Sequence, residues 1–429
     1  MSNSKIYQSI TDGRQQNTPS YICALSNVKE LLSIDEITKR LTTNSNIKVI
    51  SSKQVSKGEY ALSKRRLIVY DFELEYKGVQ YPIKILNKNN SASNLTPYVA
   101  DASITADEKE EAAKLTNYLE VSLTFQKSTL NDFHLQLQVI KLLVPNGQFI
   151  LDNSSKKMMS YKWLNSVTST ECLPSPNFLF LIRTIQEGDK YWIRTEGLSR
   201  CCAIELEIIN IKNGVYEMIG LLNNTALEFI YHMHKEDQQF QIGYDGLKIH
   251  LCWMRWENAV KKVGKEALGG EKNRIVEQLN INPYQGASGV IMGIEEGELT
   301  SPELYLSTLR ENPTYIVQEE EINRISTLAK ERFESFKAIA GKHQGDQENW
   351  VCLLQLAEVA PNNTIEHLWY KVEKIEGDLI EAVLINQPYW IEAKNYGDLH
   401  QITDISKLTN WAIYHDHQKY TPDTIYSLQ

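Results

Sequence analysis

Glu366-His367-Leu368-Trp369-Tyr370 opens a run of short strands near the C-terminus of this 429-residue chain. Leu368, Tyr370 and Val372 share one face of an extended segment, because side chains alternate between the two faces of a strand. Gly-Asp pairs at 377–378 and 397–398 supply turns between the strands. The region therefore predicts a small C-terminal β-rich domain, built as a curled sheet or barrel-like, with one or two helices.

The remainder of the chain alternates helical and extended patterns, which predicts an α+β, multidomain protein. An N-terminal α/β sandwich domain is expected over residues 1–172, with its helices on one sheet face. Within it, Ser33 and Glu36 form a capping box that starts a helix. Hydrophobic residues at helical spacing over 215–232 predict a long buried helix in the next domain.

Domain boundaries are predicted where the composition changes. Leu173-Pro174-Ser175-Pro176 holds two prolines in four residues and favours an extended link. A middle α+β domain is then expected over 173–313, and the C-terminal domain over 314–429. The glycine-rich stretch 264–300 is expected to run over the surface as a loop.

Composition limits the classes of function. The net charge of −9, from 45 Lys and Arg against 54 Asp and Glu, disfavours nucleic acid as a partner. Six cysteines without a Cys-x-x-Cys spacing disfavour a disulfide scaffold or a zinc ribbon. No membrane span and no apolar signal-peptide core are found, so a cytoplasmic location is expected and no membrane partner.

The C-terminal hundred residues resemble a known family. The motifs are a polar helix from Glu319, followed by Glu366–Trp369, Asn386-Gln387-Pro388, Gly397-Asp398, Asn410-Trp411 and the tail Tyr420-Thr421-Pro422. Together they resemble the YegJ-like domain, a bacterial domain family of unknown function. The resemblance implies no activity, because none is established for that family.

The middle of the chain is also similar to known proteins. Tyr191–Arg200, followed by Glu205-Leu206-Glu207, resembles long bacterial proteins of unknown function that end in this same domain. Those relatives tend to place histidines near Thr195. This chain has Arg194 and Glu196 there, which argues against histidine-based chemistry.

The first candidate site is in this middle segment. Arg194, Glu196 and Arg200 surround a glycine turn and could clamp an anionic ligand, because guanidinium groups bind carboxylate and phosphate in bidentate fashion. The alternative is an ion-pair network that fixes a loop between strands.

The second candidate is a scattered set of potential zinc ligands: Cys201, Cys202, His232, His234, His250 and Cys252. Residues two apart point the same way on a strand, as in strand-borne zinc sites. However, 232 and 234 end a predicted helix, and adjacent cysteines face opposite sides of a strand. Buried cysteines and helix-terminal histidines are the preferred interpretation, and no metal is expected.

The third candidate is the surface of the C-terminal domain. Residues 349–429 hold 11 Asp and Glu against 5 Lys and Arg, and four of the eight Trp. Tyr389, Trp390, Glu392 and Asp398 are the predicted partner-binding residues, since exposed aromatics beside carboxylates suit a basic protein. The alternative is that the indoles are core, above all Trp369 and Trp411.

No motif of a nucleotide loop, a nucleophile elbow or a metalloprotease occurs in the sequence. No cofactor is expected, and a non-enzyme is favoured over an enzyme. The sequence therefore predicts a protein that binds a macromolecule, with an immunity-like or defence-associated role as one form of this hypothesis. The alternative is a small-anion sensor or enzyme centred on the middle domain.

Overall fold

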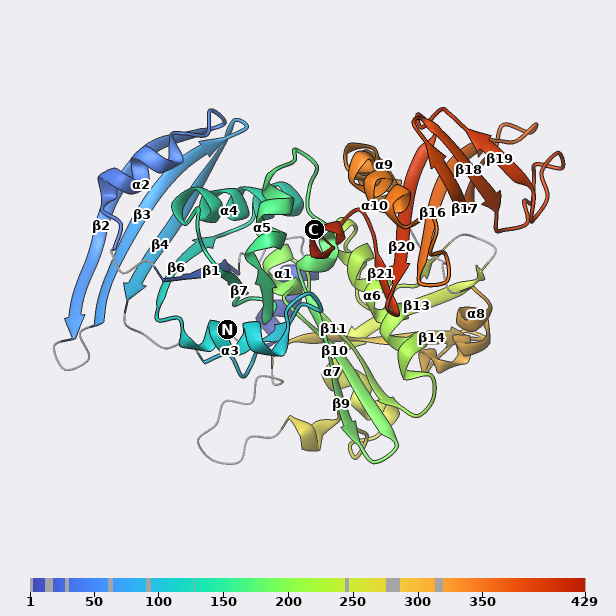
Figure 1. Cartoon of the computed structure of the whole chain (residues 1–429). Helices are drawn as coiled ribbons and strands as arrows, with labels where there is room; N and C mark the ends of the chain where they lie inside the picture. Colours follow the sequence, from blue (N-terminus) through green and yellow to red (C-terminus); the bar gives the residue numbers. More distant parts are fainter. Residues whose placement is uncertain are drawn as a thin grey trace. The chain divides into compact units, whose positions relative to one another are not determined.

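The computed structural model describes residues 3–11, 18–27, 31–60, 65–89, 94–126, 128–243, 247–274, 286–312 and 319–428. These residues form helices and three β-sheets (Figure 1), which confirms the predicted multidomain α+β class. The chain divides into two compact units. Unit 1 comprises Met1–Thr168 with Pro174–Ile316, and unit 2 comprises Ser169–Leu173 with Val317–Gln429. The predicted boundary at 313/314 lies outside the described residues.

The first sheet of unit 1 has eight strands. In sheet order they are β2 Ile47–Tyr60, β3 Arg65–Tyr76, β4 Val79–Asn89, β6 Asn117–Leu123, β1 Ser20–Ser26, β7 Phe149–Asp152, β8 Lys157–Ser160 and β5 Val99–Ala100. Its helices are α2 Ile34–Leu41, α3 Ala106–Lys114, α4 Thr129–Leu143 and α5 Tyr161–Thr168. The capping box at Ser33 and Glu36 is confirmed at the start of α2.

Both faces of this sheet carry helices, so the expected one-sided arrangement is wrong. Tyr81 on β4 donates a hydrogen bond to Asp132 on α4, which places α4 on one face. Cys23 and Leu25 point to the opposite face and pack with Ala112 of α3. Figure 1 likewise shows α4 and α5 on the other side of the sheet from α3. The short α3 is largely polar and buries one side chain, Ala112, so its sequence gives little indication that it packs on the sheet.

The second sheet of unit 1 has seven strands. They are β12 Phe240–Ile242, β13 Ile249–Arg255, β14 Ser288–Glu295, β11 Glu205–Ile211, β10 Lys190–Glu196 and β9 Leu181–Glu187 in order, with β15 Glu298–Thr300 paired to β14. The helices of this region are α6 Val215–Tyr231, α7 Trp256–Val263 and α8 Leu306–Glu311. The long buried helix predicted over 215–232 is therefore confirmed.

The glycine-rich stretch is not a surface loop throughout, because β14 is a central and largely buried strand. A Cβ on Gly289 would lie 2.9 Å from the Trp253 ring, and one on Gly293 would lie 2.5 Å from Leu304. These glycines let neighbouring side chains approach the backbone closely. Glycine content alone does not separate this role from a loop.

The N-terminal helix α1, Asn3–Thr11, contacts the second sheet although it precedes the first one. The hydroxyl of Tyr7 accepts a hydrogen bond from the backbone N–H of Ser288 at 3.1 Å and lies 2.9 Å from a Glu257 carboxylate oxygen. The Arg255 guanidinium lies over the Tyr7 ring, 4.7 Å from its centre. Segments far apart in the sequence therefore share one core in unit 1.

Unit 2 has a six-stranded antiparallel sheet with two helices. In order the strands are β19 Leu399–Ile402, β18 Leu379–Leu384, β17 Ile365–Glu376, β16 Trp350–Val359, β20 Leu408–His415 and β21 Gln418–Tyr420. The helices are α9 Glu319–Glu331 and α10 Phe333–His343. Because β19 and β21 are opposite ends of the order, the sheet is open and the barrel-like alternative is wrong. Trp411 is fully buried and packs on Phe336 of α10, as the core alternative predicted.

Arg200 and Asp152 form a fully buried ion pair that joins the two sheet regions of unit 1. The guanidinium donates to Asp152 at 3.0 and 2.6 Å, to Ser20 Oγ at 3.0 Å, and to the Leu179 carbonyl at 3.2 and 2.6 Å. All five guanidinium N–H groups are thus used. Removal of one partner would leave a buried charge uncompensated.

We expect Arg200→Met to lower the free energy of unfolding by about 3–5 kcal/mol, because Asp152 keeps its charge without a partner. Urea denaturation followed by tryptophan fluorescence measures this change. Lys114→Met is the control, since it removes an exposed ion pair with Glu111 that is worth about 0–1 kcal/mol. Equal effects of the two substitutions would contradict the structural role of Arg200.

Candidate functional site

Six large apolar side chains that unit 2 exposes lie on two of its segments, and Tyr414 on β20 is exposed as well. Tyr389 is 88% exposed, Trp390 56% and Tyr396 67%, all in the loop 385–398 between β18 and β19. Leu399 follows this loop, while Val359 and Ile365 face each other across the β16–β17 turn and are also exposed. We call these six residues the aromatic surface: Val359, Ile365, Tyr389, Trp390, Tyr396 and Leu399.

Glu366 joins the two segments of the aromatic surface. Its carboxylate accepts hydrogen bonds from the backbone N–H of Tyr389 at 2.7 Å and of Trp390 at 3.1 Å. Glu366 follows Ile365 on β17, so the two aromatic residues are held next to the β16–β17 turn. Hydrogen bonds from backbone N–H groups to a carboxylate are stronger than neutral ones. The backbone that carries Tyr389 and Trp390 is therefore fixed before any partner arrives.

Further side chains fix the remainder of the loop. Asp398 accepts a hydrogen bond from the backbone N–H of Asn395 at 2.7 Å, and Gln387 accepts one from that of Tyr396 at 3.3 Å. Lys394 donates to a carboxylate oxygen of Glu358 and to the Tyr370 hydroxyl, each at 2.9 Å. Because loop 385–398 is anchored at several points, its backbone has little conformational freedom to lose on binding.

Burial and charge shift the pKa values of the groups beneath the loop. Burial raises the pKa of Glu358, but the hydrogen bonds and charges of Lys394 and Lys407 outweigh it and leave the pKa below its usual value. Burial also lowers the pKa of His400, and the nearby Lys394 cation lowers it further. The His400 ring packs edge-on against Tyr370, with 5.4 Å between ring centres. The loop thus rests on an ionised Glu358 and a neutral His400.

The four predicted partner-binding residues lie on one loop, but they differ in role. Tyr389, Trp390 and Glu392 point to solvent, whereas Asp398 is half-buried and forms the turn with Asn395. Of the other indoles in unit 2, Trp369 is half-buried and Trp350 is stacked between His343 and His415. Sequence reasoning missed Glu366 as the residue that fixes the loop. It also missed Tyr396, although this residue stands beside the predicted turn at 397–398.

Arg194 and Glu196 line a cleft of about 430 Å³ in unit 1, together with Lys156, Arg183 and Glu205. Arg183 pairs with Glu196 through two hydrogen bonds of 2.8 Å. Glu205 accepts hydrogen bonds from Thr195 Oγ1 and from the backbone N–H groups of Gly197 and Ser199. The ion-pair network offered as the alternative is therefore present, and anion binding in the cleft stays a prediction.

Arg200 does not join Arg194 and Glu196 in that cleft. It is 1% exposed and its donors are taken by Asp152, Ser20 and the Leu179 carbonyl. Gly197 explains the separation, because it has φ +119° and starts the 3-10 turn Leu198–Cys201 that turns the chain inward. The predicted three-residue clamp is wrong in this respect.

The cysteines and histidines of the second candidate have separate surroundings. His232 and His234 both lie near Glu228, and His250 bonds Gln239. Burial raises the pKa of Cys201 to about 12 and that of Cys252 to about 11, so both thiols stay protonated at neutral pH. Within the described ranges, no three His, Cys, Asp or Glu side chains are grouped to hold a metal ion.

The fold and these sites define a multidomain α+β protein. Family models place it more closely: residues 20–174 match the N-terminal part of DUF4026, a protein of unknown function, and residues 182–292 match the C-terminal part. Residues 319–429 match DUF2314, described as an uncharacterized protein conserved in bacteria. The chain therefore contains both DUF4026 domains followed by a DUF2314 domain.

These matches confirm the resemblance at the level of bacterial-type domains of unknown function, while the YegJ-like assignment stays a prediction. No curated protein and no solved structure matches the chain. Across the described part of the sequence, no helix combines the length and apolar character that a membrane crossing requires.

We expect Glu366→Ala to release loop 385–398 without unfolding unit 2. Loss of charge-assisted hydrogen bonds worth about 1.5 kcal/mol should speed amide exchange at Tyr389 and Trp390 roughly tenfold. Hydrogen–deuterium exchange measures this rate. Glu376→Ala, an exposed position on the same strand, is the control and should leave the loop amides unchanged. Unaltered exchange in both variants would mean that Glu366 does not fix the loop.

His400 gives unit 2 a pH dependence. Because its folded pKa lies below the usual 6.5, its neutral form contributes stability that is complete above that value and is lost as pH falls through the folded pKa. Between about pH 7 and 5, the Tm of His400→Gln should fall less than that of the wild type. Thermal unfolding of unit 2 followed by circular dichroism tests this, with the exposed His417→Gln as control. Equal pH slopes for the wild type and His400→Gln would contradict it.

Proposed function

We propose that this protein binds another protein and carries out no catalysis itself, with the aromatic surface of the DUF2314 domain as the docking site. One observation carries the proposal: Tyr389, Trp390 and Tyr396 are exposed on a loop that Glu366 and Lys394 hold in place. Exposed, rigid Tyr and Trp side chains are typical of the residues that dominate binding energy at protein interfaces.

The charge of the domain indicates the kind of partner. Between residues 349 and 429, 11 acidic and 5 basic side chains give a net charge of −6, out of −9 for the whole chain. Glu392 is exposed on the same loop as the aromatic residues. A negative field accelerates encounter with a positively charged surface, and Lys and Arg side chains also stack on aromatic faces. The partner we propose is therefore a basic protein.

We propose a bacterial, cytoplasmic protein whose C-terminal part, 319–428, is YegJ-like. Capture of a basic protein is the chemistry required to neutralise a cationic toxin, which supports an immunity-like or defence-associated role. A gene neighbourhood that contains toxin or phage-defence genes would support this role, and a purely metabolic neighbourhood would oppose it.

Trp390→Ala should reduce partner capture about thirtyfold, because a central Trp contributes about 2 kcal/mol or more at an interface. The test uses the immobilised full chain and quantitative mass spectrometry of captured proteins, followed by titration of each purified candidate. Tyr414→Ala is the matched control, since Tyr414 is an exposed aromatic residue on β20. A true partner should be basic, should be lost only with Trp390→Ala, and should bind more weakly at high salt.

Two outcomes would overturn the proposal. The first is that no captured protein distinguishes Trp390→Ala from Tyr414→Ala. The second is that the proteins that do distinguish them are acidic or bind with no dependence on salt.

A further inference from the structure

A short segment of the chain leaves unit 1 and packs with unit 2. Helix α5 ends at Thr168, the five residues Ser169–Leu173 group with unit 2, and the chain returns to unit 1 at Pro174. We call residues 169–173 the strap. Thr170 is only 7% exposed, so the strap is docked and not merely adjacent.

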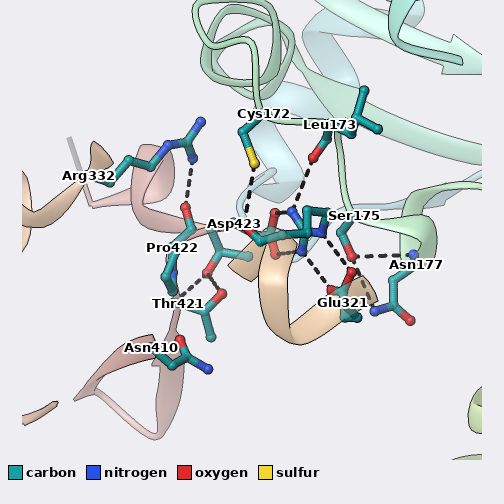
Figure 2. Close-up of polar contacts among 12 residues, drawn as sticks. Cys172, Leu173, Ser175, Asn177, Glu321, Arg332, Asn410, Thr421, Pro422 and Asp423 are labelled. Atoms are coloured by element: carbon teal, nitrogen blue, oxygen red, sulfur yellow. Dashed lines mark hydrogen bonds and ion pairs between the residues drawn. The ribbon is translucent and has the colours of Figure 1, made fainter. Parts of the chain in front are cut away.

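Three polar contacts hold the strap on helix α9. Thr170 Oγ1 donates to a carboxylate oxygen of Glu331 at 2.5 Å, and the Cys172 thiol donates to the Arg324 carbonyl with 3.4 Å between sulfur and oxygen. The Arg324 guanidinium donates to the Leu173 carbonyl at 3.2 Å. Figure 2 shows Cys172 and Leu173 directed toward α9 in this way. The three hydrogen bonds involve three different groups of the strap: the Thr170 hydroxyl, the Cys172 thiol and the Leu173 carbonyl.

The contact surface on α9 is fixed independently of the strap. Four hydrogen bonds of 2.6–2.9 Å join the Arg324 guanidinium to the carboxylates of Glu321 and Asp423. The bond to the Leu173 carbonyl uses the fifth and last guanidinium N–H. The fork of Arg324 is rigid and both of its other partners are in unit 2. One N–H group of Arg324 is therefore oriented toward the strap and can donate to any carbonyl placed at the position of Leu173.

The spacing on α9 matches the strap, which is bent: the backbone N–H of Cys172 donates to Thr170 Oγ1 at 2.9 Å. Arg324 and Glu331 are seven residues apart, so they lie on the same helix face and about 10 Å apart along the axis. Thr170 and Leu173 are three residues apart and span at most about 10 Å. The strap runs antiparallel to α9, with Thr170 at Glu331 and Leu173 at Arg324. Thr170 and Leu173, near the two ends of the strap, are thus hydrogen-bonded to Glu331 and Arg324 on α9.

We propose that Arg324 and Glu331 of α9 form a peptide-binding site for a short bent segment with a hydroxyl residue two positions before a thiol residue. The strap occupies this site within the chain and can be displaced by the same segment supplied as a separate peptide. The site is distinct from the aromatic surface and uses none of its residues, so it stands or falls independently of the proposed function.

The strap competes with any added peptide for the site on α9 and therefore lowers the apparent affinity of that peptide. A tethered segment acts at an effective concentration on the order of 1 mM, so a free peptide must compete against it. The wild-type chain should bind the peptide weakly for this reason. A chain with a weakened strap should bind the same peptide more tightly, because the site on α9 is left vacant more of the time.

The experiment uses the full chain and a fluorescein-labelled synthetic peptide of residues 167–176, titrated by fluorescence anisotropy. Thr170→Val combined with Cys172→Ala removes two of the three strap contacts and should lower the apparent Kd at least tenfold relative to the wild type. Addition of Glu331→Ala should reverse the gain, because the ligand hydroxyl then has no side-chain acceptor at this position. Glu320→Gln is the control, since Glu320 is an exposed residue of the same helix, and should behave as the wild type.

A second measurement needs no variant. Excess peptide that carries Cys172→Ser should displace the strap of the wild-type chain and increase the rate of Cys172 alkylation at least threefold, while a scrambled peptide should not. The proposal is overturned if the strap variant binds no more tightly than the wild type and the peptide leaves Cys172 alkylation unchanged. A gain in affinity that survives Glu331→Ala would overturn the assignment of the site to α9.

Discussion

The structure depends on buried guanidinium groups whose five donors are all used. Arg200 joins the two sheet regions of unit 1, and Arg324 joins α9 to the C-terminal tail and to the strap in unit 2. Such groups need not add net stability, because desolvation of the charges offsets most of their attraction. They instead favour the native packing over alternative packings in free energy, since any displacement leaves a buried charge without its partners.

Hydrogen bonds with polar side chains also hold loop 385–398 in one conformation. Its exposed rings would be costly to order on a mobile loop, because each immobilised side chain and backbone segment loses entropy. Glu366, Lys394 and Asp398 remove much of that cost in the free protein by bonding the loop backbone and its neighbours. In the docking that we propose, the polar residues under the loop act through its backbone and contact no partner themselves.

Sequence reasoning succeeded where the signal is local. Alternation in Leu368, Tyr370 and Val372, the capping box at Ser33 and the helical spacing over 215–232 each report a neighbouring stretch of chain, and each is confirmed. It failed where one residue type serves two purposes. The glycines of β14 resemble those of a loop, and Arg200 resembles a surface ligand residue as much as a buried anchor.

The sequence by itself determined the α+β class and the acidic character of the C-terminal domain, whereas the short strand expected near Trp390 is a loop in the structure. These follow from periodicity, composition and turn residues, which act over a few positions. Only the tertiary structure decided that Arg200 meets Asp152, that Glu366 holds the backbone of Trp390, and that residues 169–173 dock on α9. Those pairings join residues far apart in the chain, and nothing in the local pattern of one partner specifies the other.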